Sequence, residues 1–89
     1  MLFRLGQVVA TPGALNVLHR SGQTPADFLT RHVSGDFGRV DGHDEKANRQ
    51  AIQEGGRILS SYTTVRGEEI WVITEADRSS TTLLLPSEY

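Results

Sequence analysis

Apolar residues change their spacing near residue 57, and this change predicts a chain that begins with helices and ends with strands. Before residue 57 the apolar positions recur at three and four residues, the period of one helix face. After it they recur towards every second residue. The N-terminal segment 3–10 is an exception, because it alternates weakly and contains the β-branched pair Val8-Val9. This segment predicts a short strand ahead of the helices.

Two Thr-Pro pairs mark the starts of the first two helices, since a threonine hydroxyl can cap a helix whose first position is proline. The first predicted helix covers residues 12–21 and stops at a Ser-Gly pair, and the second covers residues 25–33. A third helix opens with an Asp-Glu pair at 44–45 and closes at a Gly-Gly pair at 55–56. Residues 34–43 between them hold three glycines and predict an irregular loop.

The remaining residues predict an antiparallel meander with strands at 57–65, 68–74 and 80–85, ended by Pro86. Helices followed by a meander indicate one α+β domain over residues 1–89. In it a short N-terminal strand and two to three helices pack on a C-terminal three-stranded antiparallel meander.

The apolar positions of these elements predict a single core. Trp71 lies in a strand that is apolar on both faces, so its burial implies helices on one side and the ends of the chain on the other. The residues expected in this core are Leu15, Leu18, Phe28, Leu29, Trp71, Ile73, Leu83 and Leu85.

Composition narrows the function classes. The 89 residues are 37% hydrophobic and 22% charged, and no apolar run approaches the ~20 residues of a membrane helix. Arg4 and Gln7 interrupt what would have to be the apolar region of a secretory signal, so we expect a cytoplasmic protein without a membrane role. The absence of cysteine excludes disulfides and thiolate nucleophiles. A formal charge of −2 argues against broad docking on nucleic acid.

The polar segment 74–81, between the last two strands, is the most distinctive feature of the chain. A tight hairpin needs only a two-residue turn, so this long polar run predicts a surface that presents groups to a partner. We expect it to meet the glycine-rich loop at one edge of the sheet. The residues predicted to gather there are His32, Asp36, Arg57, Thr74 and Arg78.

His32 is the first candidate for chemistry, because it ends the second helix and a histidine can act as general acid or base near neutral pH. The alternative is a structural role, in which the imidazole bonds the last helix carbonyls. His43 is expected to be an exposed or capping side chain, and His19, on a helix flank beside Arg20, is expected to have no special role. The histidines and aspartates of residues 32–44 match no recognised metal-binding spacing, and we predict neither a metal nor a cofactor.

Arg57 and Arg78 are candidates for anion recognition, because the guanidinium fork suits phosphate and carboxylate groups. The same meander also carries Tyr62, Thr74, Glu75, Asp77, Ser79 and Thr81. The alternative is an internal network, in which Arg78 pairs with a neighbouring carboxylate at 75, 77 or 88 and stabilises a wide turn.

Four segments carry a resemblance to known proteins: Ala10–Leu15, His32–Gly38, Arg57–Tyr62 and Trp71–Tyr89. Together they look like a family of small uncharacterised bacterial proteins found on plasmids and integrated elements, over nearly the whole chain. Because that family has no established activity, the resemblance implies a mobile-element context and a polar site but no reaction.

A looser similarity rests on helices ahead of a meander, with the runs His32–Asp36 and Gly42-His43 ahead of a strand bearing Ser79–Thr82. This arrangement is similar to the barnase, EndoU and RelE group of metal-independent ribonucleases. The resemblance implies His32 as the acid or base with His43 as its partner, Arg78 or Arg57 as the phosphate clamp, and Thr81 as an orienting group. The chain departs from that group because its meander has no lysine and its net charge is negative.

Two functions from different classes follow. The leading one is a small accessory protein of a mobile element that binds a macromolecule, a protein rather than a nucleic acid, as an inhibitor or regulator. The alternative is an endoribonuclease of the kind described above. The predicted catalytic residues are His32, Arg78 and Thr81, and the predicted binding residues are Asp36, Arg57, Tyr62, Thr74, Glu75, Asp77 and Ser79.

Overall fold

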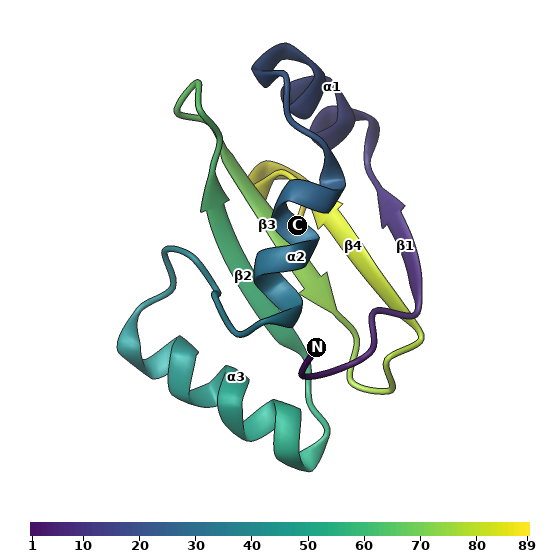
Figure 1. Ribbon diagram of the computed structural model, residues 1–89, viewed down its shortest axis with the longest axis vertical. Coiled ribbons are helices and arrows are strands. Elements are labelled where there is room, and N and C mark those ends of the chain that lie inside the picture. The colour runs from purple at the N-terminus through teal and green to yellow at the C-terminus, as the bar shows by residue number, and fades with distance from the viewer.

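A four-stranded mixed sheet with helices against one of its faces organises residues 1–89 in the computed structural model (Figure 1). None of the helices is long and apolar enough to cross a membrane. The elements in chain order are β1 (Gln7–Ala10), α1 (Pro12–Ser21), α2 (Pro25–Val33), α3 (Gly42–Glu54), β2 (Ile58–Thr63), β3 (Glu69–Thr74), β4 (Ser80–Leu84) and the 3-10 turn η1 (Pro86–Glu88).

Helices α1 and α2 begin and end where their caps predict. The Thr11 hydroxyl accepts a 3.1 Å hydrogen bond from the Ala14 amide at the start of α1, and Gly22 ends this helix with a left-handed φ of 69°. Helix α3 begins two residues earlier than the acidic pair predicted, because the Asp41 carboxylate accepts from the Asp44 amide at 2.8 Å and caps the helix.

The strand order is β1-β4-β3-β2 in a mixed sheet, so the prediction of a three-stranded antiparallel meander was wrong, whereas the α+β class is confirmed. The pairs β2–β3 and β3–β4 are antiparallel. Strand β1 lies parallel to β4, with Val8 opposite Thr81. The helices supply the long crossover that a parallel pair requires. Gly6 permits this pairing, because its φ is +64° and a side chain there would collide with the carbonyl of Arg78.

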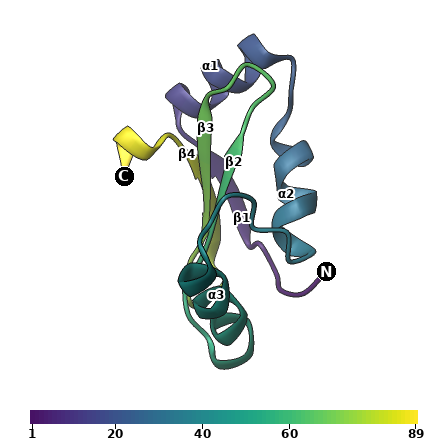
Figure 2. The same cartoon turned by 90° about the vertical axis from the view of Figure 1, so that its left-hand side faces the viewer.

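Strand alternation gives the sheet two different faces. The inner face packs against α1 and α2, and Figure 2 shows α2 on this side of the sheet and the C-terminal segment on the opposite, outer side. Inner-face side chains are Ile58, Ser60, Tyr62, Ile70, Val72, Thr74, Thr81 and Leu83. Outer-face side chains are Leu59, Ser61, Thr63, Glu69, Trp71, Ile73, Thr82, Leu84 and Val9.

The main apolar cluster lies on the inner face and confirms part of the predicted core. It contains Leu18, Phe28 and Leu83, with Leu29 and Leu85 packed against it. Leu15 was predicted wrongly, because the inward stripe of α1 is Ala14, Val17 and Leu18, and Leu15 keeps 49% of its surface exposed. Trp71 and Ile73 lie on the outer face, so they do not belong to this cluster. A second, smaller cluster joins Phe3, Phe37, Ala51 and Ile58.

The outer edge of β2 is closed by polar groups from other elements. The Asn48 side chain of α3 donates to the Leu59 carbonyl at 2.7 Å and accepts from the Leu59 amide at 3.0 Å. The glycine-rich loop bonds the same edge further along, where the Ser61 amide donates to Phe37 and the Ser61 carbonyl accepts from Arg39. Strand β2 therefore offers no free ladder positions at these two residues.

Candidate functional site

His32 is part of a buried chain of polar side chains on the inner face. Its Nδ1 atom lies 2.6 Å from the Ser60 hydroxyl, and its Nε2 atom lies 2.9 Å from the Thr74 hydroxyl. Thr74 in turn lies 2.7 Å from Thr81, whose hydroxyl donates to the Leu5 carbonyl at 2.7 Å. Except for Leu5, each of these side chains is fully buried, with 0% of its surface exposed.

These contacts fix the imidazole tautomer. Thr81 uses its one hydroxyl proton on the Leu5 carbonyl, so it must accept the proton of Thr74. Thr74 then has no proton left, and the Nε2–H of His32 must donate to it. Nδ1 is therefore the unprotonated nitrogen and accepts from Ser60. Every polar atom in this chain has a partner when His32 is neutral.

Burial also keeps the His32 ring neutral. Desolvation lowers the pKa of His32 to about 4, and the Phe3 ring meets it edge-on at 5.0 Å between centroids. The predicted alternative, in which the ring bonds the last carbonyls of its helix, is not what the structure shows, because both nitrogens bond strand hydroxyls instead. A ring with no exposed surface cannot reach a substrate proton in this conformation.

Arg78 joins the β3–β4 turn to the end of α3. Its guanidinium donates to the carbonyls of Gly56 at 2.7 Å and Ala51 at 2.9 Å, and to the turn carbonyls of Glu75 and Ala76 at 3.1 Å. The backbone of Arg78 has a φ of 60°, the one positive value outside glycine. Its partners are carbonyl oxygens, so neither the expected anion site nor the expected pairing with a carboxylate describes its contacts.

The polar segment 74–81 presents less surface than its sequence suggested. Thr74, Ser80 and Thr81 belong to strands, and two of them point into the buried chain. The connecting turn contains only residues 75–79, where the Asp77 carboxylate accepts from the Ser79 amide at 2.9 Å. Asp77 and Ser79 thus form a local turn contact.

Asp36 and Tyr62 meet at a separate place, near the β2 edge. The Tyr62 hydroxyl donates to the Asp36 carbonyl at 2.6 Å, and Arg31 bonds the Asp36 carboxylate at 2.7 Å. The hydrogen bond from Arg31 lowers the pKa of Asp36, and burial raises the pKa of Tyr62 to about 12. These contacts fold the glycine-rich loop back onto α2.

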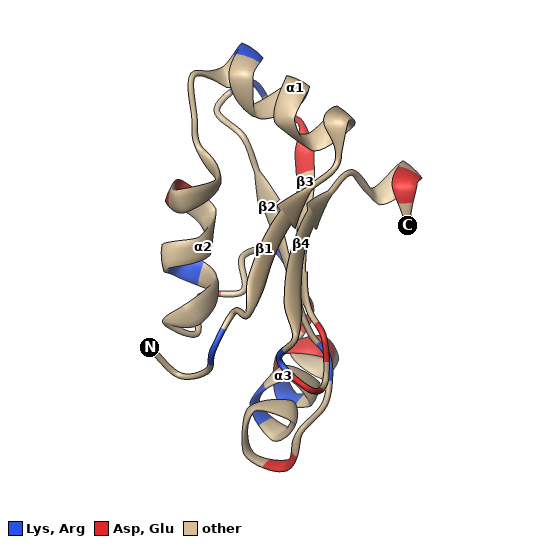
Figure 3. Ribbon diagram, turned by 90° about the vertical axis from the view of Figure 1, so that its right-hand side faces the viewer, with Lys and Arg blue, Asp and Glu red and all other residues tan.

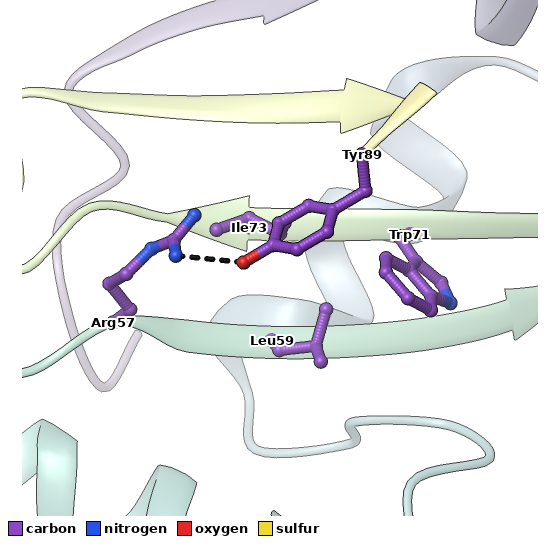
Figure 4. Close-up of a pocket in the computed structure, with 5 residues that line it drawn as sticks. All are labelled: Arg57, Leu59, Trp71, Ile73 and Tyr89. Atoms are coloured by element: carbon purple, nitrogen blue, oxygen red, sulfur yellow. Dashed lines mark hydrogen bonds between the residues drawn. The ribbon is translucent and has the colours of Figure 1, made fainter. Parts of the chain in front are cut away.

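The outer face carries a groove that the sequence did not predict as a site. The groove encloses about 240 Å³, and Figure 4 shows the five side chains that line it. Arg57 donates to the Tyr89 hydroxyl at 3.0 Å and lies 3.4 Å from the Glu75 carboxylate. The rings of Trp71 and Tyr89 meet at 5.5 Å with an angle of 67° between their planes. The lining residues are Arg57, Leu59, Trp71, Ile73 and Tyr89.

The position of Tyr89 over this groove depends on the residue before it. The Glu88 carboxylate accepts from the Thr11 hydroxyl at 2.6 Å and from the Leu85 amide at 2.8 Å. These hydrogen bonds, led by that from Thr11, lower the pKa of Glu88. The segment is thereby tied to the start of α1, and Tyr89 extends over the sheet while 67% of its surface stays exposed.

Glu69 lies at the other end of β3 and bonds a groove residue. Its carboxylate accepts from the Ser61 hydroxyl at 2.6 Å and from the Trp71 indole at 3.1 Å. The bond from Ser61, followed by that from Trp71, lowers the pKa of Glu69. The indole therefore has a fixed orientation, with its apolar ring towards the groove.

The structure does not bring the predicted site residues to one place. His32, Thr74 and Thr81 are together but buried on the inner face, whereas Arg57 is on the outer face. No group of three or more side chains could hold a metal ion. One signal in the sequence could have revealed the groove residues that the prediction missed. The strand Ile70 to Ile73 is apolar on both sides, and only one side can face the helices, so the other side needs a different cover.

Comparison with known proteins gives no match to any family model, curated protein or solved structure.

Proposed function

We propose that this protein is a binding module that holds a protein partner on the outer face of its sheet. The observation that carries this proposal is a row of side chains across all four strands, formed by Leu59, Ile73, Thr82 and Val9 in register. No helix covers this row, and Val9 keeps 40% of its surface exposed. Three of these four side chains are apolar, whereas a sheet face open to water is normally polar, so the exposed part of the row indicates contact with another molecule.

The groove within this face suits an aromatic side chain of the partner. Tyr89 already lies there, with its ring edge against Trp71 and the Arg57 guanidinium 5.7 Å from its ring centre. Aromatic and cation–π contacts of this kind are typical of the residues that dominate protein interfaces. A partner's aromatic side chain would take the place of Tyr89 or pack beside it.

Charge favours a protein over a nucleic acid as this partner. Glu69 begins β3 and Glu75 directly follows it, so the two carboxylates flank the groove, and Arg57 is already paired with Glu75. A phosphate backbone would meet two carboxylates and no free cluster of cations here. The net charge of −2 acts in the same direction.

The resemblance to plasmid and integrated-element proteins supplies a setting for this proposal. In that setting the module is an accessory protein that inhibits or regulates its partner by occupying it. The ribonuclease alternative finds no support in the contacts described above, because His32 has no exposed surface and Arg78 bonds backbone carbonyls.

A test uses N-acetyl-tyrosinamide as a probe for the groove in the Tyr89→Ala variant. We expect the probe to shift the NMR signals of Leu59, Trp71 and Ile73, and N-acetyl-alaninamide at the same concentration to leave them in place. Wild-type protein should bind the probe more weakly, because the Tyr89 ring already packs against Trp71 at the groove wall. Equal shifts from both probes, or shifts spread over the inner face, would show that the groove has no preference for aromatic groups.

The partner itself can be sought with a photo-crosslinking residue at Thr82, which lies on the outer face, and at Gln50, which is exposed on α3. A specific protein should crosslink from position 82 and not from position 50. The crosslink from position 82 should disappear when Trp71→Ser is also present. If position 50 captures the same protein as efficiently, the outer face is not the binding surface.

A further inference from the structure

The outer edge of β1 has free backbone hydrogen-bonding groups. The Gln7 amide donates inward to the carbonyl of Ser79, just before β4, and the Thr11 amide donates to the Leu83 carbonyl of β4, both at 3.0 Å. Alternation along a strand therefore turns the amide and carbonyl groups of Val8 and Ala10 outward. No element lies beyond β1 in Figure 1, and Figure 3 views this edge directly.

This edge lacks the protection that the opposite edge has. At β2, Asn48 and the loop at 37–39 bond the outward groups of Leu59 and Ser61, whereas no side chain or loop bonds the outward groups of β1. Strand β1 also carries no charged residue, as Figure 3 shows, and Val8 is 43% exposed. Charges, prolines and covering loops are the usual means of preventing edge pairing, and none is present on β1.

We propose that β1 pairs with β1 of a second copy of this chain, antiparallel, around a two-fold axis through Val9. In this register Val8 of each copy lies opposite Ala10 of the other. Each such pair exchanges two N–H···O hydrogen bonds, so four bonds satisfy all the outward groups of both strands. Val9 meets Val9 of the second copy on the outer face, in the closer, non-hydrogen-bonded type of pair.

The neighbouring registers are excluded by the residues that flank β1. A shift in one direction would pair Ala10 with Gly6, whose φ of +64° is not extended. A shift in the other direction would pair Val8 with Pro12, which has no N–H and begins α1. A register displaced by one residue would place the outward N–H and C=O groups of one strand opposite residues whose groups already bond β4, so no hydrogen bonds could form. Only the register that pairs Val8 with Ala10 gives every outward N–H and C=O group of both strands a partner. We therefore favour a second copy of this chain as the strand that pairs with β1.

Pairing at this edge would make one continuous sheet from two copies. Because Val9 ends the row Leu59, Ile73, Thr82, Val9, the row would continue into the second copy across the two-fold axis. The proposal stands on backbone geometry and does not depend on the binding function of the groove.

The Val9→Cys variant tests this pairing directly. The Cα atoms of a non-hydrogen-bonded antiparallel pair lie about 4.5 Å apart, which is within the range of a disulfide. The chain has no cysteine of its own, so the new thiol can only join two copies. Val65→Cys is the matched control, because Val65 is 76% exposed in the β2–β3 turn.

We expect oxidised Val9→Cys protein to form a covalent dimer about tenfold faster than Val65→Cys, because pairing raises the local thiol concentration. Equal rates for the two variants would overturn the proposal.

A second test removes one outward hydrogen bond and keeps the β1–β4 ladder. Val8→Pro deletes an N–H that β4 does not use, whereas Val8→Ala retains it. In sedimentation experiments the wild type and Val8→Ala should be dimers and Val8→Pro a monomer. A monomeric wild type, or a dimer that survives Val8→Pro, would contradict self-pairing. A monomeric wild type would also leave an extended peptide of another protein as the occupant of this edge.

Discussion

The buried chain from Ser60 through His32 to Thr81 couples the charge of one residue to folding. Protonation of His32 would place a hydrogen on Nδ1, where the Ser60 hydroxyl now donates, and would charge a ring that has no contact with water. The chain of hydroxyls is satisfied only around the neutral ring. At the residue scale, His32 is therefore a pH-dependent component of stability and not a proton donor for a substrate.

Stability should fall as pH drops from 7 to 5. The pKa of His32 is about 4 in the folded protein against 6.5 for a free side chain, so the unfolded state binds more protons between these values. The stabilisation is fully present above pH 6.5 and is lost as pH falls towards 4. The expected loss is about 2 kcal/mol between pH 7 and pH 5, in a window above the titration of ordinary carboxylates.

Urea unfolding of the wild type and two glutamine variants at a series of pH values measures this loss. His32→Gln should be less stable at pH 7 and should lose almost none of its unfolding free energy by pH 5. His19→Gln removes an exposed histidine and should keep the wild-type pH dependence. A wild-type curve that is flat from pH 7 to pH 5 would contradict the burial of a neutral ring.

At the scale of elements, α3 acts on the sheet through one amide side chain. Asn48 reproduces with its side chain the two hydrogen bonds that a further strand would make to Leu59. The sequence predicted α3 from its acidic start and its glycine end, which are local signals. It did not predict the contact with β2, because nothing in the spacing of residues 48 and 59 shows that an amide will meet a strand edge.

Asn48→Ala should open the β2 edge. Leu59 would lose both partners, and a partly buried pair of backbone groups left without partners costs about 1–3 kcal/mol. Native-state hydrogen exchange followed by NMR should show faster exchange at the Leu59 amide. Asn16→Ala, which removes an exposed asparagine of α1, should leave this exchange rate unchanged. Unchanged protection of Leu59 in Asn48→Ala would mean that the side chain does not close the edge.

At the scale of the whole molecule, the sheet has one face under helices and one face under a short segment of chain. The sequence predicted the helices, the antiparallel pairing of the last three strands and, of the two chain ends expected beside Trp71, the C-terminal one, because caps, alternation and a strand apolar on both sides are local patterns. It did not predict β1 beside β4, because these strands are about 70 residues apart and Val8-Val9 fits either sheet face. The sequence prediction placed His32 in the candidate site. A histidine beside a loop gives no sign in the sequence that the hydroxyls of Ser60 and Thr74 enclose it.

Removing Tyr89 should uncover the groove without unfolding the protein. Trp71 is the only tryptophan, so its fluorescence reports on this face alone. In Tyr89→Ala we expect emission at longer wavelength and faster quenching by acrylamide, while the unfolding free energy changes by no more than about 1 kcal/mol, since the lost bond to Arg57 is exposed. Tyr89→Phe keeps the ring and should behave like the wild type. Identical quenching in all three proteins would show that Tyr89 does not shield Trp71.

The closed β2 edge also sets a limit on the size of any assembly. A sheet with two open edges can add copies without end and grow into a fibre, because each addition leaves a new edge exposed. Here β2 is closed at Leu59 and Ser61 and β1 is open at Val8 and Ala10, and a two-fold pairing uses the β1 edges of both copies at once. Growth therefore stops at eight strands, with Asn48 and the 37–39 loop at both ends, so the same contacts that complete the fold would keep the protein from polymerising.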